Sequence, residues 1–139
     1  MQGKAFLGKE SQQERALHFA FRTRMDERNE NARAVCDNQF LYIRNYMPYT
    51  PWMQSLNYLW KMKATKVWAE HVQSGKASKV EERFFNPKGW TEELYDMEKD
   101  PKQHTNLAEK AEYAEVLKSF KAKLQAKIKS LQIEQKGEK

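Results

Sequence analysis

Residues 91–110, TEELYDMEKDPKQHTNLAEK, contain the junction that decides the fold of this chain. The run Glu93–Met97 is short and rich in apolar residues, which favours a β-strand. Asp100-Pro101 then ends regular structure, because proline cannot continue a strand or a helix interior. Asn106-Leu107-Ala108 leads into a long helical pattern. The stretch therefore predicts a last strand, a turn and a helix that covers the sheet.

The helical pattern after this junction is amphipathic. Lysines fill the positions between its apolar residues, as expected for a helix with one buried and one solvated face. The spacing predicts a helix of about 20 residues. Its apolar residues are Tyr113, Val116, Leu117, Phe120, Leu124, Ile128 and Leu131.

Upstream of the junction, alternating patterns predict three more strands. Residues 17–23 alternate strictly, so they read as a half-buried strand. Residues 25–31 read as a charged connection. Residues 32–36 and 40–46 read as a hairpin with a two-residue turn at Asp37-Asn38, since Asp and Asn tolerate turn conformations.

Short helices are expected between the third and fourth strands. Residues 54–61 and 65–74 have helical character, with Thr65 as N-cap and Gly75 just after the end of the second helix. Ser78 and Glu81 fit a capping box for a third short helix. The fold class is therefore α+β: a small four-stranded antiparallel sheet with a long C-terminal amphipathic helix on one face and short helices inserted between strands three and four.

Composition limits the function classes. At 139 residues the chain is expected to be one domain. No apolar run approaches the roughly 20 residues that span a bilayer, so no membrane partner is expected. The single cysteine, Cys36, excludes an internal disulfide and any zinc site built on several cysteines.

The net charge of +6 is concentrated near the C-terminus. Residues 118–139 hold seven Lys and two Glu, a balance of 7 − 2 = +5. Such a run is typical of the solvated face of a helix. The alternative is a free-standing basic module that binds nucleic acid or acidic polymers through the Lys-rich helix.

Candidates for catalysis are few. His18, His71 and His104 are far apart in sequence and have no ligand-like spacing. There is no glycine-rich phosphate loop, metalloprotease motif or nucleophile elbow. Cys36 would need a neighbouring base to act as a nucleophile, and the sequence identifies none. We expect a structural thiol there and no metal or catalytic residue in the chain.

A charged cluster follows the first strand, and its residues are our candidates for binding substrate. Arginine has a planar fork that suits sulfate, phosphate or carboxylate. Loops at strand ends often carry such groups. The alternative is a solvated salt-bridge network. The candidate residues are Arg22, Arg24, Asp26, Glu27 and Arg28.

A second cluster is aromatic and could stack on sugar rings or bases, cover a missing neighbour, or fill the core. Exposed aromatic surface also allows self-association, so a homodimer is a further possibility. The cluster consists of Tyr49, Trp52, Tyr58, Trp60 and Trp68.

Three stretches together resemble one family. EELYDMEKDPKQHTNLA is similar to the C-terminal signature of the sulfatases, which are formylglycine-dependent enzymes of the alkaline-phosphatase-like superfamily. FAFRTRMDERNENARAVCDNQFLYIRNYMPY resembles the preceding strand and hairpin in bacterial heparan-sulfatase-like members, and GKAFLG (residues 3–8) resembles the interdomain linker. Cys36 and Leu41 depart from the basic residues usual there. The resemblance covers roughly residues 3–125.

The resemblance implies a C-terminal subdomain without the catalytic unit. Formylglycine, made from a Cys or Ser in a Cys/Ser-x-Pro/Ala-x-Arg motif, and calcium would belong to that missing domain. Cys36 is followed by Asp-Asn-Gln, which is not this motif. The implied partners are the sulfatase catalytic domain and a sulfated carbohydrate, and the implied parent protein is periplasmic or secreted. The fragment alone is expected to be inactive.

The expected organisation has three parts. Residues 1–15 form a linker from the catalytic domain, residues 16–133 form the subdomain, and residues 134–139 form a disordered basic tail.

Overall fold

The computed structural model describes residues 16–137 except Asp26, and gives no description of the side chains of Met25 and of residues 132–137. The predicted linker, residues 1–15, lies outside the described residues. The four strands form one antiparallel sheet in the order β1-β2-β3-β4, which confirms the predicted class. They are β1 (His18–Met25), β2 (Arg28–Cys36), β3 (Phe40–Asn45) and β4 (Glu92–Asp96).

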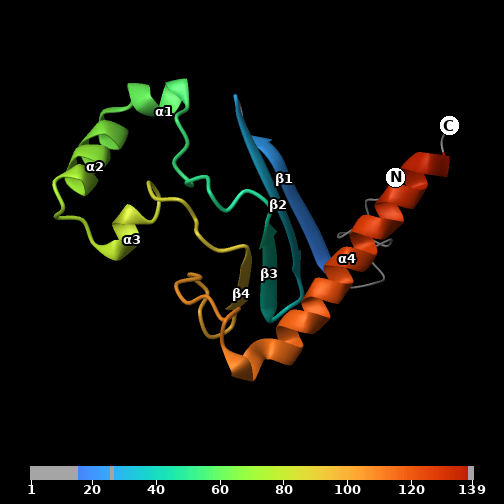
Figure 1. The fold of residues 1–139 in the computed structure, drawn as a ribbon. Coiled ribbons are helices and arrows are strands. Elements are labelled where there is room, and N and C mark those ends of the chain that lie inside the picture. Colours follow the sequence, from blue (N-terminus) through green and yellow to red (C-terminus); the bar gives the residue numbers. More distant parts are fainter. Residues whose placement is uncertain (1–15, 26, 138–139) are drawn as a thin grey trace, which may run out of the picture.

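The helices lie in two places. A short 3-10 helix, η1 (Ala111–Tyr113), leads into α4 (Ala114–Gly137), which crosses one face of the sheet (Figure 1). Residues 46–91, here called the insertion, connect β3 to β4 and extend away from α4 (Figure 1). The insertion carries α1 (Asn57–Lys61), α2 (Lys63–Gln73) and α3 (Lys79–Glu82). The predicted long C-terminal helix and inserted short helices are thus confirmed.

The strand register sorts side chains onto two faces. One row across the sheet consists of Phe19, Val35, Tyr42 and Leu94, which pair in turn from β1 to β4. Neighbouring side chains on a strand point to opposite faces. The next row therefore faces away from α4, and it consists of Ala20, Ala34, Ile43 and Glu93.

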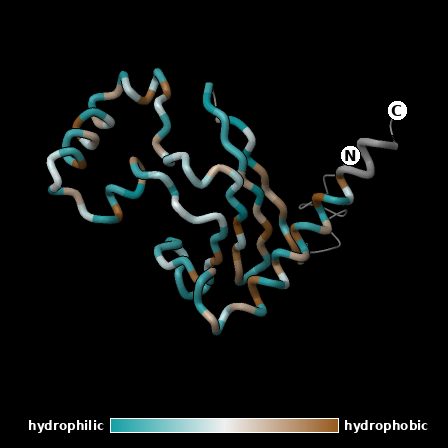
Figure 2. Tube along the Cα trace, in the orientation of Figure 1, coloured by the Kyte–Doolittle hydropathy of each residue, from teal (hydrophilic) through white to brown (hydrophobic). Residues whose placement is uncertain are grey.

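The hydrophobic core lies between the sheet and α4. Phe120 and Leu124 of α4 are 3% and 4% exposed, and they pack with Val35, Tyr42, Leu94 and Leu107. The ring of Phe40 meets Phe120 edge-on, with the centroids 6.2 Å apart. Figure 2 shows apolar positions recurring along α4, and those that contact the core include Val116, Leu117, Phe120 and Leu124. The α4 residues that pack against the sheet are therefore among the apolar residues predicted from their helical spacing.

Glu92 connects α4 to two strands. Its Oε1 atom accepts a hydrogen bond from the Tyr42 hydroxyl at 2.7 Å and lies 2.8 Å from Nζ of Lys121. Arg44 is its third partner, at 3.2 Å. Burial raises the pKa of the Glu92 carboxyl, but the hydrogen bonds from Lys121 and Tyr42 and the positive charges nearby outweigh it, so the pKa is below its ordinary value.

The outer edge of β4 is closed by Asn106. Its Oδ1 accepts from the backbone N–H of Leu94 at 3.0 Å, and its Nδ2 donates to the carbonyl of Glu92 at 3.1 Å. Leu107 N–H then donates to the carbonyl of Leu94 at 2.8 Å. Asn106 thus pairs with the strand and does not begin the helix, which starts after Lys110. Residues 106–108 lead into the helix as predicted, and the Asn106 carboxamide in addition takes the place of a fifth strand at the β4 edge.

Two predicted connections differ from the structure. The connection at 25–31 is far shorter, since β2 already begins at Arg28, which pairs with Met25. Residues 28–31 are polar, so their sequence did not indicate a strand. The charged side chains of Arg28 and Glu30 are satisfied by Ser55 and Lys88 of the insertion. In the β2–β3 turn, the Asp37 carboxylate accepts from the backbone N–H groups of Gln39 and Phe40, at 2.9 and 2.7 Å. The turn residues are therefore Asn38 and Gln39, one position later than predicted.

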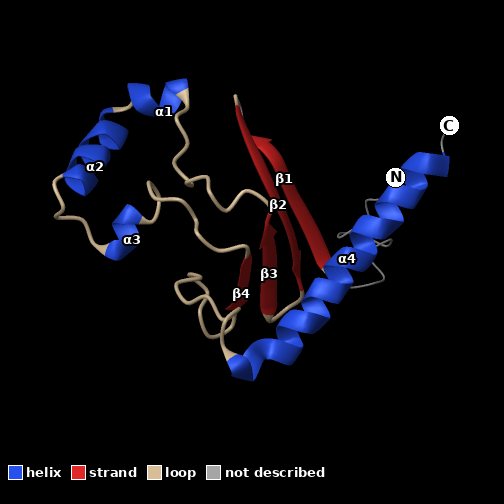
Figure 3. Cartoon of the chain, viewed as in Figure 1, coloured by secondary structure: helices blue, strands red, loops and turns tan. Residues whose placement is uncertain are grey.

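The insertion helices follow their capping signals in two cases out of three. Ser78 and Glu81 form the predicted capping box of α3, and Gly75 has a φ of +69° just after α2. Figure 3 shows the loop that separates α2 from α3. Thr65, predicted as an N-cap, is instead buried within the first turn of α2. The reason is that α1 ends immediately before α2, with only Met62 between them, so the helix begins two residues earlier than expected.

Replacing Phe120 by Ala should lower the free energy of unfolding by about 3–5 kcal/mol, since it leaves a cavity between α4 and the sheet. Phe21→Ala is the matched control, because Phe21 is 77% exposed, and its cost should be below about 1 kcal/mol. Urea unfolding followed by circular dichroism measures both. Equal losses would contradict this placement of the core.

Replacing Glu92 by Gln should destabilise the protein more at pH 7 than at pH 3. Because folding lowers the Glu92 pKa, its ionised form stabilises the fold above the unfolded value, which is near 4.5. That contribution disappears as the pH falls through the folded-state pKa. Urea unfolding at both pH values measures the difference. Glu70→Gln, at an exposed position on α2, is the control, and a pH-independent loss in Glu92→Gln would refute the assignment.

Candidate functional site

The structure brings the predicted charged cluster to the end of the β1–β2 hairpin. Arg22 and Arg24 lie on β1, on either side of a register shift, and Arg28 begins β2. Asp26 lies outside the described residues. Arg22 and Arg24 each take part in an interaction, so neither residue is free. A role of these residues in substrate binding stays a prediction.

Glu27 and Arg28 connect the hairpin end to the start of α1. The Glu27 carboxylate accepts from the backbone N–H of Asn57 at 2.8 Å and from its Nδ2 at 3.2 Å. The residue before α1 is Leu56, which cannot cap a helix with its side chain. Glu27 therefore supplies a carboxylate to the helix N-terminus from 30 positions away. Arg28 Nε donates to the carbonyl of Ser55 at 2.7 Å.

The predicted aromatic cluster divides among separate contacts. Trp68 packs against Phe84 and Phe85, with ring centroids 5.1 and 5.4 Å apart, and so helps to form a small core within the insertion. Trp52 lies under the ammonium group of a buried lysine, Lys88. Tyr49 and Tyr58 are 67% and 46% exposed. Trp52 and Trp68 thus have structural contacts, the indole nitrogen of Trp60 is buried, and the two tyrosines are exposed at the surface.

The thiol of Cys36 has a histidine opposite it that the sequence did not reveal. His18 on β1 is its cross-strand partner. Burial raises the pKa of the Cys36 thiol, and the charge of Asp37 raises it further, so the reactive thiolate is disfavoured. The environment matches a structural thiol and not an activated nucleophile.

A buried ion pair connects the insertion to the sheet. Nζ of Lys88 lies 2.7 Å from both carboxylate oxygens of Glu30 on β2. The two side chains are 0% and 2% exposed. The ammonium also lies 4.5 Å from the ring centroid of Trp52. Isolated burial of either charge would be costly, so each partner depends on the other.

A second buried polar network starts from β4. The Tyr95 hydroxyl donates to Glu93 at 2.5 Å and accepts from Nη2 of Arg83 at 3.1 Å. Asn45 Nδ2 donates to the other oxygen of Glu93, also at 2.5 Å. Burial and the hydrogen bond with Glu93 raise the Tyr95 pKa far above its ordinary value, so this hydroxyl stays protonated. The Tyr95 hydroxyl therefore lies between the Glu93 carboxylate and the Arg83 guanidinium and hydrogen-bonds to both.

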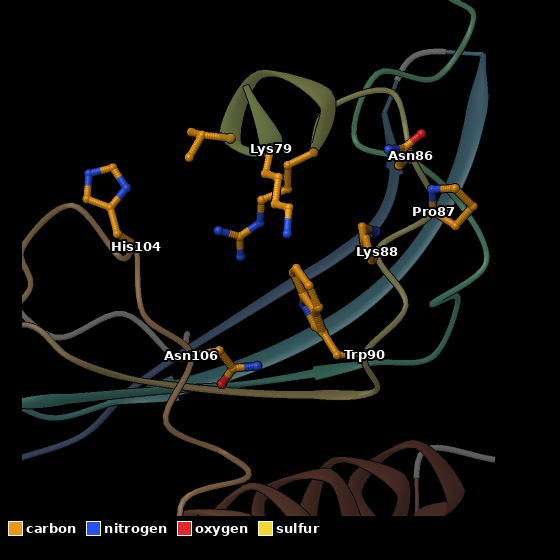
Figure 4. Close-up of a pocket in the computed structure, with 9 residues that line it drawn as sticks. Lys79, Asn86, Pro87, Lys88, Trp90, His104 and Asn106 are labelled. Atoms are coloured by element: carbon orange, nitrogen blue, oxygen red, sulfur yellow. The ribbon is translucent and has the colours of Figure 1, made fainter. Parts of the chain in front are cut away.

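Arg83 also borders a hollow of about 380 Å³ between α3 and the turn that carries His104 (Figure 4). We call it the α3 hollow. Its walls contain four basic side chains and, among the residues described, no carboxylate. Figure 4 shows Lys79 extending from α3 into this space, with His104 across from it and Trp90 below. The lining side chains that carry charge, an amide or an indole are Lys79, Arg83, Asn86, Lys88, Trp90, His104 and Asn106.

Sequence reasoning missed the α3 hollow because its residues come from three separate segments. By its sequence context alone, His104 is an ordinary surface residue and Lys79 is part of a solvated helix. The one available signal is RFFNPKGW, residues 83–90, which combines Arg, Asn, Lys and Trp just before the last strand. Only the packing of the insertion on β4 brings these residues near His104.

The lysines of α4 are partly engaged within the molecule. Lys121 pairs with Glu92, and Lys123 lies 4.4 Å from the ring centroid of Phe120. Lys118 and Lys129 are exposed. In the part of the chain that is described, no group of His, Cys, Asp or Glu side chains could hold a metal ion. Within the same part, no helix is long and apolar enough to cross a membrane.

Comparison with known proteins gives a sequence relation to a sulfatase. The chain is 32% identical over 124 residues to the ulvan-active sulfatase of Formosa agariphila. The match covers 89% of this chain but only 21% of that protein. No family model matches the chain. Nearly the whole chain is therefore related to a sulfatase, but it corresponds to only about a fifth of that enzyme's length.

Replacing Lys88 by Met should cost about 3–5 kcal/mol of unfolding free energy, because Glu30 is left buried without its partner. Changing both residues, Glu30→Leu with Lys88→Met, should recover most of the loss, since no lone charge remains. Chemical denaturation of the two variants and the wild type measures this. A double variant that is as unstable as the single one would contradict the assignment.

Proposed function

We propose that this chain is the C-terminal part of a sulfatase, a sulfuric ester hydrolase that acts on sulfated carbohydrate. The observation that carries the proposal is the relation to the ulvan-active sulfatase over 89% of the chain. The stretch that resembles the family signature also has a clear structural role here. It forms β4, the Asn106 contact that closes its edge, and the approach to α4.

The catalytic chemistry of such an enzyme would lie outside this chain. Formylglycine would supply the nucleophile and calcium would bind the sulfate, but the described residues fit neither group. Cys36 lacks the modification motif, and its thiol pKa is raised. The acidic side chains do not gather into a metal site in the described part of the chain. We therefore derive no reaction step through these groups.

The contribution of this chain would be structural and positional. The row Ala20, Ala34 and Ile43 faces away from α4, and none of its three side chains is fully buried. The two alanines of this row have small side chains, which allow another surface to approach the strands closely. We propose that the catalytic domain packs against this row. The β1–β2 hairpin end, with Arg22 and Arg24, would then lie beside the domain boundary, where a sulfated sugar could reach it.

The sulfatase relation also leads us to propose that the parent protein is exported, to the periplasm or outside the cell. This proposal rests on the family relation alone.

A chimera tests the proposal directly. The matching 124-residue region of the ulvan-active sulfatase is replaced by this chain, and sulfate release from that enzyme's own substrate is measured. We expect a soluble protein with activity well above that of a version lacking the region. The isolated chain should release no sulfate from an aryl sulfate. A chimera no more active than the deletion would count against the proposal.

The packing surface has its own control within this experiment. Ala34→Lys introduces a long charged side chain on the proposed interface, and should leave the isolated chain folded but abolish activity in the chimera. Val67→Lys, at a 53% exposed position on α2, should affect neither. Full activity of the Ala34→Lys chimera would exclude this face as the contact.

A further inference from the structure

The α3 hollow has an unbalanced positive charge. Lys88 is neutralised by Glu30, whereas Lys79 takes part in no ion pair among the described residues and Arg83 reaches the Glu93 carboxylate only through the Tyr95 hydroxyl. His104 interacts electrostatically with Asp100 of its own turn. Like charges in one concave space repel each other, so a hollow with this lining is stabilised by an anion.

Two contacts fix the orientation of the Arg83 guanidinium. Its guanidinium lies 4.6 Å from the ring centroid of Trp90, and its Nη2 donates to the Tyr95 hydroxyl. Stacking and this hydrogen bond together fix the plane of the fork. A fixed guanidinium loses less conformational entropy on binding than a mobile one.

Two donors of the stacked pair remain unused. Nε of Arg83 and Nε1 of Trp90 are buried, and neither has a hydrogen-bond partner within the described part of the chain. Buried donors without partners are costly and uncommon. An acceptor that enters beside the stack, with a small shift of either side chain, would reduce this cost. Because Nε1 of Trp60 and of Trp68, outside the hollow, are unsatisfied in the same way, these donors support a ligand only together with the charge of the hollow and the fixed plane of Arg83.

The remaining walls suit a polar ligand larger than a simple ion. Lys79 extends into the space from α3, and His104 lies on the other side (Figure 4). Asn106 uses its carboxamide on the β4 edge, which holds this wall in place. A volume of about 380 Å³ lies within the range of small-molecule sites.

We infer that the α3 hollow binds the anionic group of an acidic sugar, a carboxylate or a sulfate, with Arg83 and Lys79 as the charged contacts. The identity of the ligand as a sugar rests on the proposed function, whereas the anion site rests on the charge of the hollow and the fixed plane of the Arg83 guanidinium. The site is distinct from the β1–β2 hairpin end. It would hold an acidic sugar unit of the polysaccharide substrate.

Titration of the whole 139-residue chain tests the inference without any activity assay. The probes are glucose 6-sulfate, glucuronate, sodium sulfate and neutral glucose, at constant ionic strength. The indole N–H resonance of Trp90, assigned with Trp90→Phe, reports binding. We expect the charged probes to shift it and glucose to leave it unchanged. The first two probes distinguish sulfate from carboxylate as the preferred group.

Lys79→Gln should weaken the binding by about tenfold, because it removes one charge-assisted hydrogen bond. Lys66→Gln is the matched control, since Lys66 is exposed on α2, and it should bind like the wild type. Arg83→Lys keeps the charge but loses the planar fork, and should bind more weakly still. If it unfolds, as circular dichroism would reveal, the Lys79 comparison stands alone.

Loss of binding in Lys79→Gln but not in Lys66→Gln supports the site. The same affinity in both variants, or no shift with any charged probe, overturns it. Neither result affects the chimera experiment, so failure of the anion site and failure of the proposed function can be told apart.

Discussion

The structure depends on a single constraint, the two-residue alternation of β4. Because successive side chains of a strand point to opposite faces, Glu92 and Leu94 meet α4 while Glu93 and Tyr95 meet the insertion side. If the register of β4 shifted by one residue, Glu92 and Leu94 would face the insertion, and Glu93 and Tyr95 would face α4. β4 lies at the sheet edge, yet four of its five side chains are buried. The side chains of β4 therefore determine the positions of both α4 and the insertion.

The two faces of the sheet are stabilised differently. Apolar contact with α4 dominates one face, while the other carries the Glu30–Lys88 pair and the Glu93 network. Apolar packing tolerates alternative arrangements of similar volume. A buried charge accepts only a partner of the right type and position, so it restricts the alternatives more strongly. The insertion, whose helices are short and make few contacts with the core, is positioned by these polar contacts.

Most of the fold could be predicted from the sequence, because its elements have clear periods. The alternation in residues 17–23 and the helical spacing after Tyr113 gave strands and helix in the right places. The sequence did not reveal contacts in which a side chain acts at a distance. Asn106 hydrogen-bonds to a strand residue 12 positions earlier, and Glu27 caps a helix 30 residues later. No local pattern carries such information. The α3 hollow was missed for the same reason, since its walls meet only after the insertion folds back on β4.

Closure of the β4 edge also limits how the molecule can associate. An exposed edge strand presents unpaired backbone groups, and these can recruit a strand from another chain. At Glu92 and Leu94 those groups are already taken by Asn106 and Leu107. The carboxamide is too short to extend the ladder further, so it acts as a terminator. In a chain with this many exposed aromatic residues, one amide side chain thereby protects the sheet against growth into aggregates along this border.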